Sequence, residues 1–323
     1  MDSAKPLISV IIPTHNRADL LPRAIKSVLD QTFTDFEVII VDDASIDDTE
    51  AVVKQMGDNR VRYIRHTHNL GGSAARNTGI REARGEYIAF LDDDDEYLPE
   101  KLKMMLQALS SSSNKVGLAY SKVKLIDYYD TVTFPDSGHN GNIFLTMLAA
   151  PQFHISSTLI KKNCIVFFDE TLPRYQDVDF HLGILEKFEA VFVNSITSIW
   201  HWGENRERVT LKTQSLEAAI KIMEQKYFIN KGYKNNASVY GRFLRTVGNI
   251  FVVDNKACDI GRRYLKRSLK VHAEMITFID YIFSFAGHSL FRWMNTVKRK
   301  IYLLANRKHL INSGSSYSGG NDR

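Results

Sequence analysis

Short apolar runs alternate with amphipathic stretches in the first part of this 323-residue chain. Four runs rich in β-branched residues predict buried strands, and three stretches with apolar residues at helical spacing predict helices between them. The strands are expected at residues 7–12, 36–41, 61–65 and 87–91, and the helices at 19–30, 47–56 and 73–84. This order over about 90 residues predicts an α/β fold, a mixed, mostly parallel sheet flanked by helices.

Polar side chains follow three of these strands, at the sheet edge where parallel sheets bind their ligands. Residues 13–17 follow the first strand, Asp42, Asp43 and Ser45 the second, and four consecutive aspartates, residues 92–95, the fourth. Six carboxylates at one edge would repel one another strongly unless a cation lay among them. Two simpler interpretations stay open: Asp42 or Ser45 caps the next helix, and the four aspartates form a solvated acidic turn.

An Asp-x-Asp sequence at a strand end can hold one hard cation, and oxygen ligands suit Mg²⁺ or Mn²⁺. Asp92 and Asp94 have this spacing, with Asp93 and Asp95 as alternates. Together with the two aspartates after the second strand, they predict a nucleotide-diphosphate site. In such a site the metal lies on the phosphates and a carboxylate accepts a hydrogen bond from a base N–H.

A glycine pair precedes the third predicted helix. Gly71 and Gly72 allow close backbone approach, and a helix N-terminus favours phosphate, so this turn and Arg76 behind it are candidates for phosphate contact. The alternatives are an ordinary turn and an arginine engaged in an ion pair.

Four ordered motifs together resemble the family 2 inverting glycosyltransferases with the GT-A fold, over roughly residues 7–205. They read VIIPTHNR at 10–17, VDDAS at 41–45, GEYIAFLDDDD at 85–95 and LP at 98–99. The resemblance implies a nucleotide-sugar donor, expected to be a UDP-sugar, and transfer of its sugar to an acceptor hydroxyl. The Gln-x-x-Arg-Trp motif of chain-forming synthases is absent from the sequence, which favours one sugar per encounter.

The resemblance also assigns residues of the donor site by position. Thr14 and Asp43 match the residues that recognise the base, and Asp42 lies beside them. Asp94, together with Asp92 or Asp93, matches the metal-binding Asp-x-Asp. The other donor-binding residues are expected to be Pro13, Asn16, Arg17, Gly71 and Arg76.

A base at the start of a later helix is implied as well, and the matching segment is Gln176-Asp177. Many family members have Glu where this chain has Gln176, so the expected base is Asp177, with Asp179 as the alternative. The carboxylate would accept the proton of the acceptor hydroxyl while that oxygen attacks the anomeric carbon, in a single displacement that inverts the configuration.

Further polar residues lie after the aspartates in the sequence. His201, between two tryptophans, could contact the diphosphate or the acceptor, or could be a packed, hydrogen-bonded histidine. His154, Ser156 and Ser157 are candidates for the acceptor entrance.

The net charge changes sign along the chain. Residues 1–210 contain 22 Lys and Arg against 30 Asp and Glu, whereas residues 211–323 contain 20 against 7. We therefore expect a GT-A domain at 1–210, a helical basic C-terminal extension at 211–312, and a disordered tail at 313–323.

Apolar residues between 276 and 293 lie beside basic ones, which predicts a helix in the plane of an anionic membrane. Such contact would bring the protein to a lipid-linked acceptor; the alternative is a helical appendage with its charges in water. No nucleic-acid-binding motif accompanies the charge, so nucleic acid is not expected as a partner.

The sequence begins without a signal-peptide pattern and has no apolar run of about 18 residues, so we expect a cytoplasmic location, peripheral to the inner face of the membrane. A nucleotidyltransferase would need a Gly-rich basic loop that residues 13–17 lack. An inactive, nucleotide-binding relative should have lost a site carboxylate, whereas Asp43, Asp94 and Asp177 are present. Synthesis of a cell-surface polysaccharide or a lipid-linked glycan is the expected setting.

Overall fold

A computed structural model describes residues 5–126, 131–135, 138–151, 153–201, 213–253, 257–287, 289–291, 293, 294 and 297. The chain divides into two compact units. The first comprises Met1–Thr210 with Gln214–Lys226, and the second Leu211–Thr213 with Tyr227–Arg323. The predicted tail at 313–323 lies outside the described residues.

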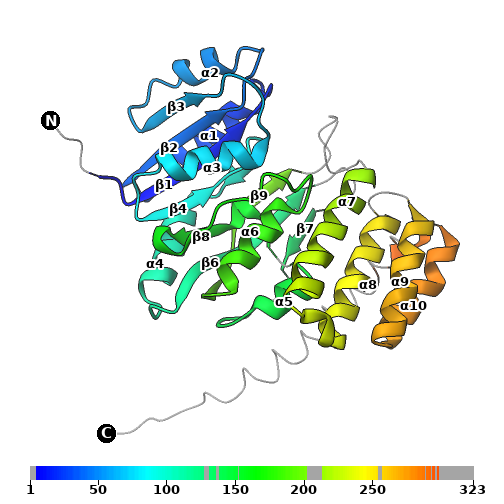
Figure 1. Cartoon of the computed structure of the whole chain (residues 1–323). Helices are drawn as coiled ribbons and strands as arrows, with labels where there is room; N and C mark the ends of the chain where they lie inside the picture. Colours follow the sequence, from blue (N-terminus) through cyan, green and yellow to red (C-terminus); the bar gives the residue numbers. More distant parts are fainter. Residues whose placement is uncertain are drawn as a thin grey trace, which may run out of the picture. The chain divides into compact units, whose positions relative to one another are not determined.

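The predicted parallel strands form one side of the sheet of the first unit (Figure 1). They are β1 (Ile8–Thr14), β2 (Phe36–Asp42), β3 (Val61–Arg65) and β4 (Tyr87–Phe90). Their order in the sheet is β3-β2-β1-β4, and all three pairings are parallel. The carboxyl ends of these strands therefore meet at one edge of the sheet.

The sheet continues beyond β4 with strands in mixed direction. These strands are β5 (Glu96–Tyr97), β6 (Val116–Ile126), β7 (Thr131–Phe134), β8 (Thr158–Lys161) and β9 (Glu189–His201). β8 runs antiparallel to β4 and β6, whereas β9 pairs parallel to β6 and antiparallel to β5. The prediction of a mixed, mostly parallel sheet is confirmed.

Helices cover both faces of the parallel strands (Figure 1). They are α1 (Leu21–Leu29), α2 (Thr49–Gln55), α3 (Gly72–Glu82) and α4 (Lys101–Ser110), followed by α5 (Phe144–Ala149) and α6 (Gln176–Leu185). Alternate residues of β1 such as Val10 belong to one core cluster with α1 and α4. The next residue, Ile11, contacts α3: a Cβ added at Gly79 would lie 2.3 Å from its side chain, so only glycine permits this approach.

Helices follow β9. α7 (Thr213–Met223) comes first, and the second unit contains α8 (Ala237–Val253), α9 (Cys258–Val271) and α10 (Met275–Phe283). α8 and α9 approach closely through Gly248 and Gly261, where an added Cβ would lie 2.8 Å and 2.4 Å from its nearest neighbour. Among the described residues, no helix is both long and apolar enough to cross a membrane.

Candidate active site

The carboxyl ends of β1 and β2 bring the predicted base-recognition residues side by side. Thr14 is the register partner of Asp42, and the amide of Asp43 donates to the carbonyl of Thr14 at 2.9 Å. Pro13 lies level with Val41 in the same ladder. The two side chains expected to recognise the base, those of Thr14 and Asp43, are buried, and so is that of Asp42 beside them.

The carboxylate of Asp43 organises the loop before α3. It accepts hydrogen bonds from the amides of Leu70 at 2.8 Å and Gly71 at 2.7 Å, and His66 Nδ1 lies 2.8 Å away. Burial alone would raise the pKa of Asp43, but these hydrogen bonds outweigh it and lower that pKa. Gly71 has φ +91°, so the turn that closes on Asp43 requires a left-handed residue. The structure thus brings Gly71 to the same edge as Asp43.

Asp42 and Asn16 hold the loops after β1 and β2 together. Asp42 accepts from the amide of Ser45 at 2.8 Å and from the hydroxyl of Tyr63. The Asn16 amide donates to Ser45 Oγ at 2.9 Å, and its side-chain oxygen accepts from the Ile46 amide at 2.8 Å. Asn16, which the sequence predicted only as a contact to the nucleotide sugar, therefore also connects the loop after β1 to the loop after β2.

Arg17 pairs with two of the four aspartates. Its Nη1 lies 2.7 Å from Asp93 Oδ1 and 3.0 Å from Asp94 Oδ2. Burial would lower the pKa of Arg17, but the charges of Asp93 and Asp94 outweigh it and raise that pKa. Burial raises the pKa of Asp93 to about 6, against the effect of Arg17. The guanidinium thus supplies part of the positive charge that the acidic edge needs.

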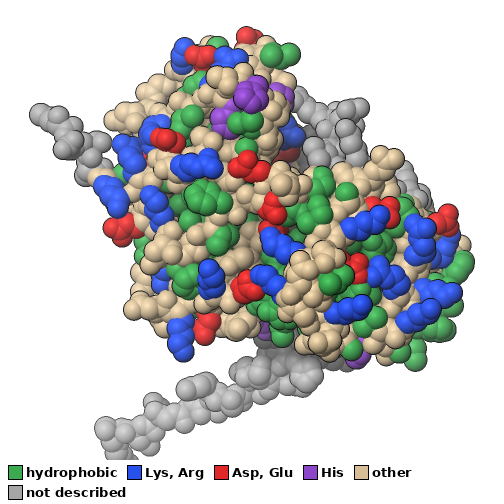
Figure 2. All heavy atoms as spheres, in the orientation of Figure 1, with side chains coloured by type: hydrophobic (Ala, Val, Ile, Leu, Met, Phe, Trp, Pro, Cys, Tyr) green, Lys and Arg blue, Asp and Glu red, His purple; other side chains and the backbone are tan. Residues whose placement is uncertain are grey.

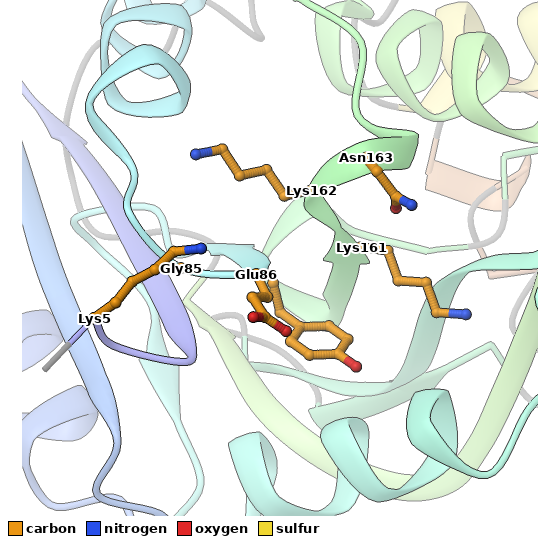
Figure 3. Close-up of a pocket in the computed structure, with 7 residues that line it drawn as sticks. Lys5, Gly85, Glu86, Lys161, Lys162 and Asn163 are labelled. Atoms are coloured by element: carbon orange, nitrogen blue, oxygen red, sulfur yellow. The ribbon is translucent and has the colours of Figure 1, made fainter.

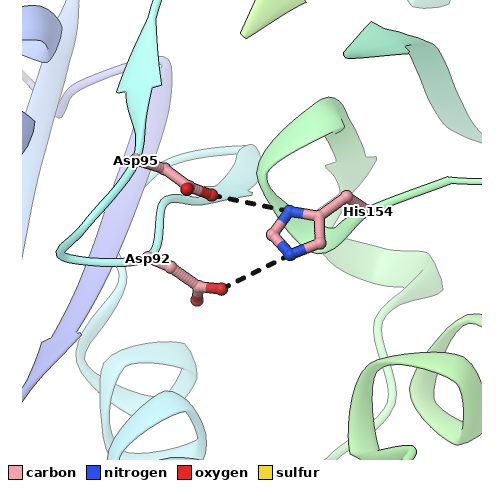
Figure 4. Close-up of side chains that lie close together, drawn as sticks. All are labelled: Asp92, Asp95 and His154. Carbon is pink, nitrogen blue, oxygen red and sulfur yellow. Dashed lines mark ion pairs between the residues drawn. The ribbon is translucent and has the colours of Figure 1, made fainter. Parts of the chain in front are cut away.

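The other two aspartates converge on a histidine from a distant part of the chain (Figure 4). Asp92 Oδ2 lies 3.7 Å from His154 Nε2, and Asp95 Oδ2 lies 3.6 Å from His154 Nδ1. Their ligand atoms all lie within 4.8 Å of one another, close enough for one metal ion. His154 stacks on Trp200 at 4.5 Å between ring centroids, and Arg76 donates to Asp92 Oδ1 at 2.6 Å. The observed cluster shares Asp92 with the predicted metal pair and contains Asp95 where the prediction has Asp94.

Asp95 is the most deeply buried of the four, with no exposed surface. It accepts hydrogen bonds from Ser156 Oγ at 2.7 Å and from the His201 amide at 3.3 Å. Burial, followed by the charges of Asp92 and its neighbour Asp94, raises the pKa of Asp95 well above its usual range. In contrast, Arg76 and His154 together outweigh burial and lower the pKa of Asp92.

The candidate histidines and serines thus surround the acidic run. The His201 ring nitrogen Nε2 lies 2.6 Å from Glu96 Oε1, directly after the four aspartates. Ser157 Oγ donates to the backbone carbonyl of His154 at 2.7 Å. A histidine between aromatic residues is more often packed than functional, so the sequence alone does not identify the partners of these residues. In the folded chain His154, Ser156 and His201 contact carboxylates of residues 92–96, whereas the Ser157 hydroxyl contacts the backbone.

Aromatic packing fixes the helix that begins with the candidate base. Phe180 of α6 lies 5.5 Å from Phe90, the last residue of β4, and stacks on Phe168 at 4.1 Å. Asp177 in the first turn of α6 is half-buried, and among the described residues it forms no ion pair. The α6 segment that carries Asp177 is therefore anchored to the end of β4 that leads into the aspartates.

The residues beside Asp177 have partners of their own. Asp179 is buried and its Oδ1 lies 2.7 Å from Lys226 Nζ, so its charge is already paired. Gln176 donates through Nε2 to the carbonyl of Leu172 at 2.8 Å, a bond that an ionised glutamate could not donate. This hydrogen bond gives a local structural reason for glutamine at position 176, where many family members have glutamate.

A cavity of about 540 Å³ lies at the opposite edge of the sheet (Figure 3). It is lined by Lys5 and Glu86, which precede β1 and β4, and by Lys161 and Lys162 at the end of β8. Lys162 Nζ donates to the carbonyl of Ala83. The cavity contains none of the residues that the sequence predicted for the site.

Comparison with known sequences shows that this chain is similar to glycosyltransferases. The profile of Glycosyl transferase family 2 matches residues 9–151. WcaA of Escherichia coli, named as a colanic acid biosynthesis glycosyl transferase, is 33% identical over 218 residues, 64% of this chain and 76% of WcaA. "GalNAc(5)-diNAcBac-PP-undecaprenol beta-1,3-glucosyltransferase" of Campylobacter jejuni is 45% identical over 105 residues, 32% of this chain and 34% of that protein.

Another relative is considerably longer than this chain. An uncharacterized glycosyltransferase of Rickettsia bellii is 32% identical over 254 residues, and the match covers 75% of this chain but only 36% of that protein. The chain thus spans about a third of the length of this relative.

Solved structures resemble the fold at low sequence identity. TarS 1–349 of S. aureus has a TM-score of 0.62 at 17% identity, with 91% of each chain covered. The mannosyltransferase PcManGT of Pyrobaculum calidifontis, solved with GDP-Man and Mn²⁺, has a TM-score of 0.52 at 17% identity, with 94% of this chain and 87% of that chain covered. The GT-A fold class expected from the sequence is confirmed.

Proposed function

Because this chain belongs to glycosyltransferase family 2, we propose that it transfers one hexose from a UDP-sugar to an acceptor hydroxyl with inversion of configuration. The observation that supports the proposal is the acidic edge together with Asp177, a half-buried carboxylate that forms no ion pair among the described residues. Asp177 is anchored to the end of β4 through Phe90 and Phe180, and residues 92–95 follow the same strand.

In this proposal Asp177 is the general base. Its carboxylate takes the proton of the acceptor hydroxyl as that oxygen bonds to the anomeric carbon, and the bond from that carbon to the diphosphate oxygen breaks. A single displacement of this kind needs no second carboxylate as nucleophile. Asp179, the alternative base, is paired with Lys226, so its lone pairs are less available.

The donor set of the acidic edge fits a divalent cation. Asp92, Asp95 and His154 offer two carboxylates and one imidazole within 4.8 Å, and carboxylates suit Mg²⁺ and Mn²⁺. In the predicted alternative, Asp92 with Asp94, one oxygen of Asp94 is already paired with Arg17. When bound, the cation would neutralise the negative charge of the diphosphate leaving group.

The nucleoside would lie over the ends of β1 and β2. In the proposal Thr14 and Asp43 contact the base, and Asn16 keeps their two loops together. Arg76 and the turn at Gly71 would lie next to the phosphates. Uracil is proposed from the family resemblance, and TarS 1–349, also solved with UDP-GlcNAc, shares this fold, whereas PcManGT was solved with GDP-Man.

The acceptor is proposed to be a glycan or a lipid-linked glycan of the cell surface, reached from the cytoplasm at the inner face of the membrane. Two relatives support this class, since one is named for colanic acid biosynthesis and the other for an undecaprenol-linked acceptor. These names state the activities of the two relatives, and the same class of acceptor is our proposal for this chain.

Calorimetric titration with UDP, GDP and dTDP, each with Mn²⁺ and with a chelator, tests the donor site. We expect UDP to bind in the presence of Mn²⁺, and we expect its affinity to fall strongly when a chelator is added. Tight binding of GDP or dTDP instead would replace uracil in the proposal. If no nucleotide bound, the donor site would be wrong and a non-catalytic relative would be favoured. The anomeric configuration of the product, read by NMR, tests inversion.

A further inference from the structure

Helix α10 buries its polar face. Thr277, Asp280 and the following Ser284 recur at intervals of three and four residues, and each is at most 1% exposed. Asp280 accepts from Arg245 Nε at 2.7 Å and from Asn249 Nδ2 at 3.2 Å, both on α8. Hydrogen bonds and an ion pair, in addition to apolar packing, therefore hold α10 in the second unit.

The opposite face of α10 is apolar and exposed. Met275, Phe278 and Ile282, with Phe285 just beyond the helix, are spaced by three, four and three residues and are 75%, 51%, 49% and 62% exposed. Further along the chain, Leu290 and Trp293 are 43% and 61% exposed, while the residue after each of them, Phe291 and Met294, packs inward with Val252. We define the apolar stripe as Met275, Phe278, Ile282, Phe285, Leu290 and Trp293.

A basic side chain contacts the apolar stripe, and the helix that carries it is rich in basic residues. The Arg262 guanidinium lies 4.8 Å from the centroid of the Phe285 ring and donates to the Ser284 carbonyl at 3.1 Å. Arg263, Lys266 and the other basic residues of α9 outnumber its one acidic residue by five to one. Figure 2 shows basic and hydrophobic side chains together on the face of the second unit that carries α9 and α10.

We propose that the apolar stripe and the basic residues of α9 form a surface that binds a bilayer containing anionic lipid, with α10 lying in the plane of the headgroups. Large apolar side chains exposed along one face of a helix mark an interaction site. Neighbouring cations identify the partner, because acyl chains accept the apolar side chains while acidic headgroups attract the arginines and lysines. The surface needs neither donor nor acceptor, so it goes beyond the proposed transfer reaction.

Vesicle flotation of the full chain tests the proposal. We expect binding to phosphatidylcholine vesicles that contain phosphatidylglycerol, weaker binding to phosphatidylcholine alone, and loss of binding at high salt. The double variant Phe278→Ser/Phe285→Ser should bind about tenfold more weakly or worse. Its matched control is Phe167→Ser in the first unit, also exposed at 56%, which should bind like the unchanged protein.

Two further readouts separate insertion from other contacts. Trp293 emission should shift to the blue on addition of anionic vesicles, and Trp293→Phe should abolish most of that shift. The pair Arg263→Glu/Lys266→Glu should weaken binding, whereas Lys103→Glu, an exposed lysine of α4, should not. Circular dichroism establishes that each variant is folded.

Three results would overturn the proposal. The first is absence of binding to anionic vesicles at low salt. The second is equal binding by the folded Phe278→Ser/Phe285→Ser variant. The third is a dimer in light scattering that this variant dissociates, without any vesicle binding, which would assign the apolar stripe to a second copy of the chain. Because no nucleotide enters these assays, their failure is distinguishable from failure of the transferase proposal.

Discussion

The acidic edge of the first unit and the apolar stripe of the second depart from the usual distribution of side chains in opposite ways. At the edge, Asp93 and Asp95 are buried at 5% and 0% exposure. At the stripe, Met275 and Phe285 face water while Asp280 is enclosed. Buried carboxylates and exposed apolar groups are each unfavourable without a partner, but the partners differ.

The difference shows what each region is suited to bind. The four aspartates of residues 92–95 lie with two arginines and His154, so this part of the acidic edge retains negative charge that suits a cation, and a bound cation would in turn attract a diphosphate. The one carboxylate of α10, Asp280, lies on the opposite face from the apolar stripe and is already neutralised by Arg245. What α10 leaves exposed to water is therefore the apolar stripe. The acidic edge is therefore suited to a cation and a reacting substrate, and the apolar stripe to an extended apolar surface.

Asp177→Asn should produce the largest effect, and it separates the rate of sugar transfer from the binding of UDP. Removing the base should lower transfer by about 10³-fold. Binding of UDP should change little, because the amide keeps the shape of the side chain. Transfer assays and calorimetry on the same preparation measure the two quantities; a parallel loss of both would contradict the assignment. The comparison variant is Asp179→Asn, which changes the carboxylate that is paired with Lys226. It should retain more transfer activity than Asp177→Asn.

Asp280→Ala tests whether the buried polar face of α10 stabilises the second unit. Removing a buried carboxylate leaves Arg245 without its 2.7 Å partner, which should lower the free energy of unfolding by about 3 kcal/mol. Asp259→Ala is the matched control, because Asp259 is 89% exposed, and it should cost at most about 0.5 kcal/mol. Urea unfolding measures both, and equal small effects would remove the distinction between the two faces.

Asp43→Asn tests charge at the acidic edge, away from the aspartate run. The Asp43 carboxylate accepts hydrogen bonds from two backbone amides. Replacing it with an uncharged amide should lower the free energy of unfolding by about 2 kcal/mol at pH 7. Its folded-state pKa is lowered, so this stabilisation is present above the unfolded pKa and is lost as pH falls through the folded pKa. The difference between variant and parent in urea unfolding should therefore shrink in acid; a constant difference would show that charge is unimportant here.

Asp92→Asn should have the smallest effect, weakening Mn²⁺-dependent UDP binding by about tenfold. Asp92 is shared by the predicted metal pair and the observed cluster, so either arrangement requires it. Comparing Asp94→Asn with Asp95→Asn then identifies the second ligand. Glu86→Gln, in the cavity at the other edge of the sheet, is the control and should leave the titration unchanged.

Most of the fold of the first unit could be predicted from periodicity, because buried parallel strands are continuous apolar runs and their helices repeat every 3.6 residues. Strands at 7–12, 36–41, 61–65 and 87–91 correspond to β1 to β4. Site roles for Thr14, Asp43, Asp94 and Asp177 came from ordered motifs, and they stay predictions. The pairings of Asp95 could not be predicted, because Ser156 and His201 lie 61 and 106 residues away in sequence.

The second unit was less predictable for a physical reason. The spacing of Phe278, Ile282 and Phe285 indicates an amphipathic helix, and in an ordinary core that apolar face would turn inward. Here Arg245 and Asn249 on α8 draw Asp280 inward instead. A pattern of hydrophobicity defines the faces of a helix, and the neighbouring helix determines which face is buried.

By itself, the sequence determined the order of the elements, the position of the aspartates at a strand end and the excess of positive charge after residue 210. These are local or additive properties of the chain. Only the tertiary structure decided that Arg17 meets Asp93 and Asp94, that Asp95 meets His154, and that α10 shows its apolar face to water. Such contacts join residues far apart in sequence, and they depend on which surfaces the fold brings together.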